Sequence, residues 1–141
     1  MAAFVKYHSF IDELSKGGHN LATAVFKLAL TNTAPTAASD TVWNTTVAPA
    51  PAAANGYSGG GNTVTTTSGT TTAGVFKLIL VDSVFTATAG GIGPFRYVIL
   101  YNSSASNKSV GYYDYASSIT LNDTETFTVD FDAANGVLTV T

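Results

Sequence analysis

The fold of this chain is decided by the stretch Phe95-Arg96-Tyr97-Val98-Ile99-Leu100-Tyr101-Asn102, which is apolar on both faces. Aromatic residues and Ile99 alternate along it with Val98 and Leu100, so a strand here places hydrophobic side chains on both sides of a sheet. The stretch therefore predicts a central strand.

The flanks of this stretch indicate how the strand is connected. Residues 90–94, Gly-Gly-Ile-Gly-Pro, predict a turn that ends any regular element before the strand. Residues 103–108 are a polar loop, and residues 110–115 are predicted to pair back against the central strand.

The sequence pattern near the C-terminus predicts a second hairpin. Thr and Asp alternate with Phe and Val over residues 126–131, and Asn135-Gly136 is typical of a hairpin turn. We expect residues 137–141 to return along residues 126–131.

Two strands are similar to each other in sequence. Val25-Phe26-Lys27-Leu28-Ala29-Leu30 is repeated almost letter for letter as Val75-Phe76-Lys77-Leu78-Ile79-Leu80. The match marks either an internal duplication or a coincidence of strand composition. With about seven to nine short strands, the chain predicts one all-β domain over residues 1–141, an antiparallel β-sandwich or jelly roll with one short N-terminal helix.

The helix is predicted within residues 1–18. Apolar side chains recur there at the 0, 3, 4, 7 spacing of one helical face, at Tyr7, Phe10, Ile11 and Leu14. Gly17-Gly18 marks its end, and Ser9 with Asp12 is a candidate capping pair. Two interpretations stay open: the helix docks on the sheet of its own chain, or it is an arm that packs on a neighbouring subunit.

The middle of the chain has little regular patterning. Residues 41–47, which contain Trp43, predict a short strand, and residues 48–72 predict a flexible connection rich in Pro, Ala, Thr and Gly. Proline removes a backbone donor and disfavours helix before it, so the run Ala48-Pro49-Ala50-Pro51 has no helical continuation. Residues 63–67 are a candidate strand within the connection. A connection of this length is usually functional or mobile.

Composition limits the possible partners. Charged residues make up 11% of the 141 residues, against ~25% in ordinary soluble domains. The lysines and arginines are scattered, at Lys6, Lys16, Lys27, Lys77, Arg96 and Lys108. Nucleic acid is therefore not an expected partner, because binding phosphates needs clustered cations. With no cysteine, disulfides and thiolate metal sites are excluded. A surface low in charge suits packing against copies of itself or against a larger partner.

No targeting or membrane segment is predicted. Residues 1–10 lack the apolar core of a signal peptide. The longest apolar runs, such as Val98-Ile99-Leu100-Tyr101, are too short to cross a bilayer. We expect cytoplasmic synthesis and no membrane partner.

The histidines do not form a catalytic pattern. His8 and His19 lie near the predicted helix, with Ser9 and Asp12 close by. Neighbours on one short helix do not converge on one reacting atom, so no catalytic triad is predicted. We expect His19 in a turn, with its ring capping a local carbonyl. The chain is predicted to be no enzyme and to have no catalytic, cofactor-binding or metal-binding residue.

The candidate carboxylates for glycoside hydrolysis are Asp114, Asp123, Glu125, Asp130 and Asp132. Their positions in turns and on outward strand positions favour structural roles. The run Asp130-Phe131-Asp132-Ala133-Ala134-Asn135-Gly136 resembles a calcium loop, but it has one residue too many before Asn-Gly and lacks the distal Glu. Gly59-Gly60-Gly61 lacks the Lys-Ser/Thr of a phosphate-binding loop, so a turn is expected there.

Five stretches together carry a resemblance to a known group of proteins. They are Tyr7-His8-Ser9-Phe10 through Leu14, His19-Asn20-Leu21, Phe26-Lys27-Leu28-Ala29-Leu30-Thr31-Asn32, Gly93-Pro94-Phe95-Arg96-Tyr97-Val98-Ile99-Leu100-Tyr101-Asn102 and Thr126-Phe127-Thr128-Val129-Asp130-Phe131. Their order resembles that of small structural proteins of tailed bacteriophages. The resemblance implies a virion protein, expected to be a capsid decoration (cement) protein on the capsid surface. It would bind the major capsid protein, associate with itself and be made in the host cytoplasm.

An alternative is a tail or fibre component, or a carbohydrate-binding module that contacts the host. The side chains that would stack on sugars are Tyr97, Tyr101, Tyr112, Tyr113, Tyr115 and Trp43. For either function we expect contact through apolar and hydroxyl-rich area rather than ion pairs. The expected contact elements are residues 2–14 and 48–72.

Overall fold

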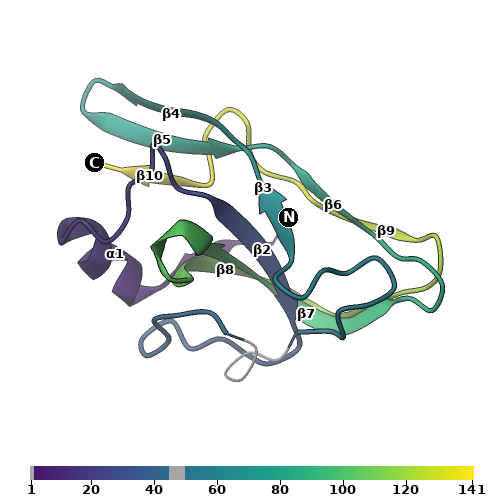
Figure 1. Ribbon diagram of the computed structural model, residues 1–141. Coiled ribbons are helices and arrows are strands. Elements are labelled where there is room, and N and C mark those ends of the chain that lie inside the picture. Colours follow the sequence, from purple (N-terminus) through teal and green to yellow (C-terminus); the bar gives the residue numbers. More distant parts are fainter. Residues whose placement is uncertain (1, 45–49) are drawn as a thin grey trace.

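The computed structural model describes residues 2–44 and 50–141 and consists mainly of two layers of antiparallel sheet (Figure 1). The first layer is a five-stranded sheet in the order β1-β8-β7-β2-β3. Its strands are β1 (Phe4–Lys6), β8 (Lys108–Leu121), β7 (Ile92–Asn102), β2 (Phe26–Thr31) and β3 (Asn62–Val64). The central strand predicted at residues 95–102 is confirmed, because β7 lies between β8 and β2.

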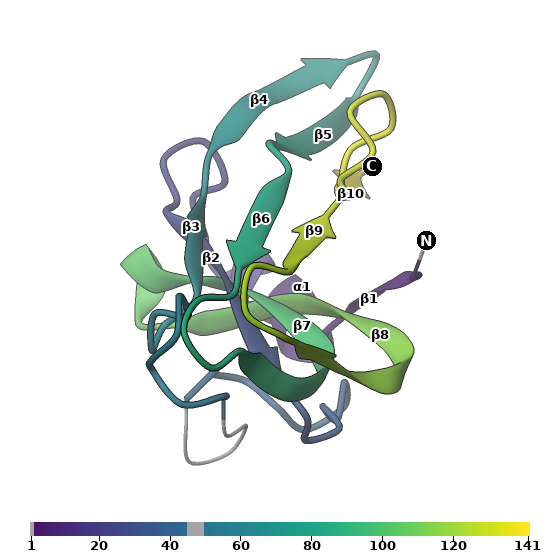
Figure 2. The same ribbon diagram turned by 90° about the vertical axis from the view of Figure 1, so that its right-hand side faces the viewer.

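The second layer contains two smaller sheets, β10-β5-β4 and β6-β9. Their strands are β4 (Thr66–Thr72), β5 (Val75–Leu80), β6 (Ser83–Thr86), β9 (Thr126–Val129) and β10 (Leu138–Val140). Figure 2 shows β6 beside β9 and β5 beside β10 across the first layer. The helix α1 (His8–Ser15) and a 3-10 turn (Ser103–Ala105) complete the regular structure. The predicted class, an all-β sandwich with one short helix, is confirmed.

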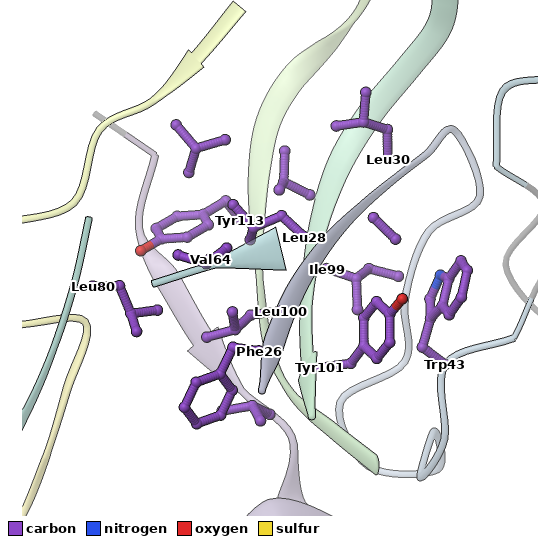
Figure 3. Close-up of a cluster of buried hydrophobic side chains, with 14 of the residues drawn as sticks. Phe26, Leu28, Leu30, Trp43, Val64, Leu80, Ile99, Leu100, Tyr101 and Tyr113 are labelled. Carbon is purple, nitrogen blue, oxygen red and sulfur yellow. The ribbon is translucent and has the colours of Figure 1, made fainter. Parts of the chain in front are cut away.

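The core lies between the layers. Period-two alternation turns Phe26, Leu28 and Leu30 of β2 inward beside Leu100 of β7, and each is fully buried. Figure 3 shows Leu80 of the second layer facing Phe26 and Leu100. Burying side chains of this size stabilises the fold by ~1.5–3 kcal/mol each.

Aromatic side chains tie the other ends of the layers together. Phe95 of β7 meets Phe127 of β9 with ring centroids 5.0 Å apart, and Tyr113 of β8 lies 6.2 Å from Phe131. The two layers therefore share one continuous core.

The opposite face of the first sheet is covered by the chain that follows β2. Trp43 stacks on Tyr101 of β7 at 4.6 Å and 18°, and the Tyr101 hydroxyl donates a hydrogen bond to the Gly60 carbonyl at 2.6 Å. Figure 3 shows Trp43, Tyr101 and Ile99 on this side of the sheet. Both faces of the first sheet are therefore covered, which explains why its central strand is apolar on both sides.

The middle connection is shorter than the sequence predicts. Residues 62–72 form β3 and β4, so the predicted connection over residues 48–72 is wrong for that part. The candidate strand at 63–67 is extended as predicted but is divided at Thr65 between two strands of different sheets. β3 pairs with β2 while β4 pairs with β5, so the chain crosses from one layer to the other near Thr65. The predicted strand 41–47 is seen only as an isolated bridge from Val42 to Lys108, and its residues 45–47 lie outside the described residues.

The hairpin of β7 and β8 is confirmed, with one correction at its start. The sequence predicts a turn over residues 90–94, but β7 already begins at Ile92. Ile92 is buried and opposes Leu121 of β8, and this pairing extends the strand through Gly93 and Pro94.

The predicted C-terminal hairpin is wrong. β9 pairs with β6 and β10 pairs with β5, so residues 126–131 and 137–141 do not pair with each other. Since β5 and β6 follow one another along the chain, β9 and β10 run in the same direction. The pairs β6–β9 and β5–β10 thus continue one another as one long antiparallel arrangement. Residues 130–137 form a loop that leaves it between β9 and β10 (Figure 2), and we call this loop the excursion.

The helix matches its prediction in place but not in detail. Tyr7 and Phe10 are buried, whereas Ile11, expected on the same face, is 48% exposed. The capping pair is wrong: the Ser9 hydroxyl donates to the Asp40 carbonyl at 3.0 Å, and Asp12 pairs with Lys16. The helix docks on its own sheet through β8, which favours the first of the two interpretations.

Candidate interaction surface

The two histidines differ in burial and in their contacts. His8 is exposed at the start of α1, whereas His19 is buried. The His19 ring lies 5.1 Å from the Phe10 ring, and its Nδ1 lies 3.2 Å from Nδ2 of Asn102 at the end of β7. The prediction that His19 caps a local carbonyl is therefore wrong, because its partner is a side chain from a distant strand.

The neighbours of His19 fix its protonation state. Oδ1 of Asn102 accepts hydrogen bonds from the backbone and hydroxyl of Ser104, so Nδ2 of Asn102 must donate to Nδ1 of His19. Burial, and next the nearby Lys108 ammonium, lower the pKa of His19, while Glu13 opposes them. The ring is thus held neutral with its proton on Nε2, which finds no partner among the described residues. The geometry is that of a structural histidine and not of a general base.

The candidate carboxylates hold the structure locally. Asp114 pairs with Arg96 at 2.7 Å, and its pKa is lowered by that hydrogen bond and by the Ala116 backbone. Asp123 accepts from the Ala89 backbone, and Glu125 from Asn122. A general acid needs a raised pKa, so Asp114 has the opposite character.

The calcium-like run forms a turn. Asp132 accepts hydrogen bonds from the backbones of Ala134 and Asn135 and from the Asn135 side chain, which together lower its pKa. Asp130 is exposed. Among residues 2–44 and 50–141, no three His, Asp or Glu side chains gather closely enough to hold a metal ion.

A depression of about 530 Å³ lies beside the end of α1. It is lined mainly by apolar groups, namely Leu14, Gly17, residues 19–22, Phe76 and Val140. Among the residues that line the depression, only His19 is ionisable. Its ring is buried against Phe10 and contacts Asn102, so packing already accounts for its position. The depression therefore offers shape without a set of reacting groups.

The aromatic residues proposed for sugar stacking are mostly inside the fold. Trp43, Tyr97, Tyr101 and Tyr113 are buried. Burial raises the pKa of Tyr101 to about 12. The half-buried Tyr112 and Tyr115 pack against other rings, at 5.4 Å from Tyr7 and 5.0 Å from Phe127. These rings therefore serve the packing of the fold.

The expected contact elements are built into the fold. Residues 2–14 include β1, which pairs with β8, and the buried Tyr7 and Phe10. Residues 48–72 include β3 and β4 and the buried Tyr57, whose hydroxyl accepts from the Leu30 backbone at 3.1 Å. Removing either element would take part of the core with it, so neither is a detachable arm.

An exposed, uncharged face lies instead on the second layer. Alternation in β6 and β9 buries Phe85 and Val129 and turns the next residues outward. We name this surface the β6–β9 face, and it consists of Val84, Thr86, Thr126 and Thr128.

The β6–β9 face combines apolar and hydroxyl groups. Val84 opposes Thr128, and Thr86 opposes Thr126. Val84 is 50% exposed, the highest value among the large hydrophobic side chains described, and Val81, just before β6, is 46% exposed. The nearest charges in sequence, Asp82, Glu125 and Asp130, lie at the ends of β6 and β9. Sequence reasoning missed this face, although Val84 stands on the polar side of the alternation in Ser83-Val84-Phe85-Thr86 and is a detectable signal.

Two further observations complete the description. Within the part of the chain that the structure describes, no helix is long and apolar enough to span a membrane. Comparisons with protein-family models, with curated protein sequences and with solved structures find no match to this chain.

Proposed function

We propose that this chain is a non-enzymatic structural protein of a tailed-phage virion, and that it decorates the capsid by binding assembled coat subunits. The observation that carries the proposal is the β6–β9 face, where Val84 and three threonines lie exposed and the charges of Asp82, Glu125 and Asp130 lie only at the strand ends. The resemblance of the chain's sequence to small phage structural proteins supplies the biological setting. The proposal assigns the chain to the capsid surface, with the major capsid protein as its partner.

The chemistry of the face suits binding by burial. Apolar area removed from water contributes ~25 cal/mol per Å² and is not screened by salt, whereas exposed ion pairs contribute ~0–1 kcal/mol and are screened. A decoration protein attached through this face would therefore remain bound at high ionic strength. The structural roles of His19, Asp114 and Asp132 agree with a protein that acts through surfaces.

The test is binding to emptied, expanded capsids of the phage that encodes the chain. We expect stoichiometric occupancy that persists in ~1 M NaCl, where exposed charges are screened beyond ~3 Å. Val84→Lys should weaken binding by at least about tenfold, because an unpaired ammonium would be buried at the contact. Val25→Lys is the matched control, since Val25 is 44% exposed on a different surface.

Three results would contradict the proposal. Release of the protein by salt alone would show that attachment is electrostatic. Equal losses for Val84→Lys and Val25→Lys would place the contact elsewhere. Failure to occupy capsids, combined with binding to tails or to host glycans, would favour the tail-fibre or carbohydrate-binding alternative.

A further inference from the structure

The strand β4 has an unpaired backbone edge. Six of its seven residues pair with β5 on one side, with a bulge between Thr66 and Ser68, and across residues 2–44 and 50–141 no strand pairs with its other side. β4 lies at the margin of the molecule in Figure 1 and again in the perpendicular view of Figure 2. An edge of this kind presents backbone donors and acceptors that another strand is able to use.

The other edge strands, β1, β3, β6, β9 and β10, have only three or four residues each, and short length limits such pairing. β1 has three residues and ends on the exposed Lys6. β9 has four residues and lies between Glu125 and Asp130. β4 is longer than either and has no charged residue, and in fact none occurs between Asp40 and Lys77. Short length and charge are how proteins block edge pairing, so β4 differs from β1 and β9 in both respects.

The hydrogen bonds of β5 show which groups of β4 face outward. The Leu78 carbonyl accepts from the Val137 backbone at 2.8 Å, so the backbone groups of Leu78 are directed toward β10. In an antiparallel strand, the N–H and C=O of one residue face the same edge and successive residues alternate. Gly69 opposes Leu78 and Thr71 opposes Phe76. Gly69 and Thr71 therefore direct their backbone N–H and C=O groups away from β5.

We propose that β4 pairs antiparallel with β4 of a second copy of this chain, about a two-fold axis at Gly69. Gly69 is the middle residue of Thr66–Thr72, so this register overlaps residues 67–71 of the two copies, and the bulge between Thr66 and Ser68 lies at the end of the overlap. Every residue of the overlap other than Gly69 then opposes a Thr or Ser of the second copy, and no charge opposes a charge. Cross-strand Thr–Thr and Thr–Ser pairs are favourable, and a contact that is its own complement is what two-fold symmetry requires.

Pairing of this kind joins the two β10-β5-β4 sheets into one continuous sheet. The pairing uses an edge of the second layer. The β4 edge and the β6–β9 face have no residue in common. The inference goes beyond the proposed function and does not depend on it, because its test uses the purified chain without capsids.

The test compares two Thr→Pro variants on opposite edges of one sheet. Thr71→Pro removes an outward N–H from β4, a substitution that edge strands tolerate. Thr139→Pro does the same on β10, because Thr139 opposes Lys77, whose backbone groups face β4. Circular dichroism and the melting temperature establish that both variants fold.

Analytical ultracentrifugation over a range of concentrations gives the readout. We expect the wild-type chain to form dimers, Thr71→Pro to raise the dimer Kd at least about tenfold, and Thr139→Pro to leave it within about twofold. A wild-type chain that stays monomeric up to ~1 mM would overturn the proposal, and so would a dimer that Thr71→Pro does not weaken.

A crosslink tests the register separately. The chain has no cysteine, so Gly69→Cys introduces a single thiol. Two-fold pairing at Gly69 places the two Cα atoms ~5.5 Å apart, within the ~4.4–6.8 Å range of disulfides. We expect oxidation to link Gly69→Cys into covalent dimers and to leave the matched Thr139→Cys variant largely monomeric. Equal crosslinking of the two variants would contradict the register.

Discussion

The β7–β8 hairpin and the β9–β10 segment look alike in sequence and fold differently. Each has alternating strands around a polar turn. β7 and β8 pair with each other along most of their length, whereas β9 and β10 pair with β6 and β5. A turn signal such as Asn135-Gly136 therefore shows that the chain bends, but it does not show that the flanking strands become neighbours.

The reason lies in what each segment has available as a partner. β7 is apolar on both faces and lies between β8 and β2, and β8 follows it after a short polar loop. β9 and β10 instead meet β6 and β5, which already form one nearly continuous run. Pairing with that run buries Val129, Phe131 and Leu138 against the first layer.

The largest expected effect comes from a core leucine in each segment. Leu100→Ala in β7 removes a fully buried side chain and should lower the free energy of unfolding by ~3–5 kcal/mol, whereas Leu138→Ala in the short β10 should cost ~2–3 kcal/mol. Urea denaturation measures both. Equal losses would mean that β10 is as central to the core as β7, and the contrast between the segments would fail.

A smaller effect separates turn strain from close packing. Gly136 and Gly74 both have φ +80, but a Cβ at Gly136 would lie 2.7 Å from the Leu78 carbonyl oxygen, and a Cβ at Gly74 meets nothing within 4 Å. Gly74→Ala should cost ~1 kcal/mol for the left-handed conformation alone. Gly136→Ala should cost ~2 kcal/mol or more because the backbone must also move. Thermal unfolding compares the variants, and a smaller loss at Gly136 would show that the excursion is loosely packed.

The smallest expected effects are changes in stability with pH, which should fall in a different pH range for each segment. His19, which anchors the end of β7, has a lowered pKa in the fold, so the unfolded chain binds its proton first. Its contribution is present above the unfolded pKa of ~6.5 and is lost as the pH falls below it. Asp132, which holds the excursion, has a pKa lowered from 3.8, so its contribution is present above that value and is lost as the pH falls through the folded pKa.

His19→Gln and Asp132→Asn test this separation. The stability difference between wild type and His19→Gln should narrow between about pH 7 and pH 5. The difference for Asp132→Asn should hold over that range and narrow only below about pH 4. Urea midpoints at each pH measure both. A difference that narrows in the same window for the two variants would contradict the assignments.

The sequence by itself determined the class of the fold and its central strand. Apolar side chains on both faces of residues 95–102 require a covered strand, and alternation in residues 75–80 indicates a half-buried one. The same alternation in residues 25–30 predicted a half-buried strand, but β2 is buried on both faces. The place of the helix followed from Tyr7 and Phe10. These features depend on local periodicity, which a sequence records directly.

Only the tertiary structure decided which strands are neighbours and which side chains remain exposed. The partners of β9 and β10, the crossing of residues 62–72 between layers and the Asn102 contact of His19 all join residues far apart in the chain. The β6–β9 face exists because the layer behind it buries Phe85 and Val129, which leaves Val84 outside. Long-range pairing depends on the shape and spacing of surfaces that form only when the layers meet, and no local pattern encodes that.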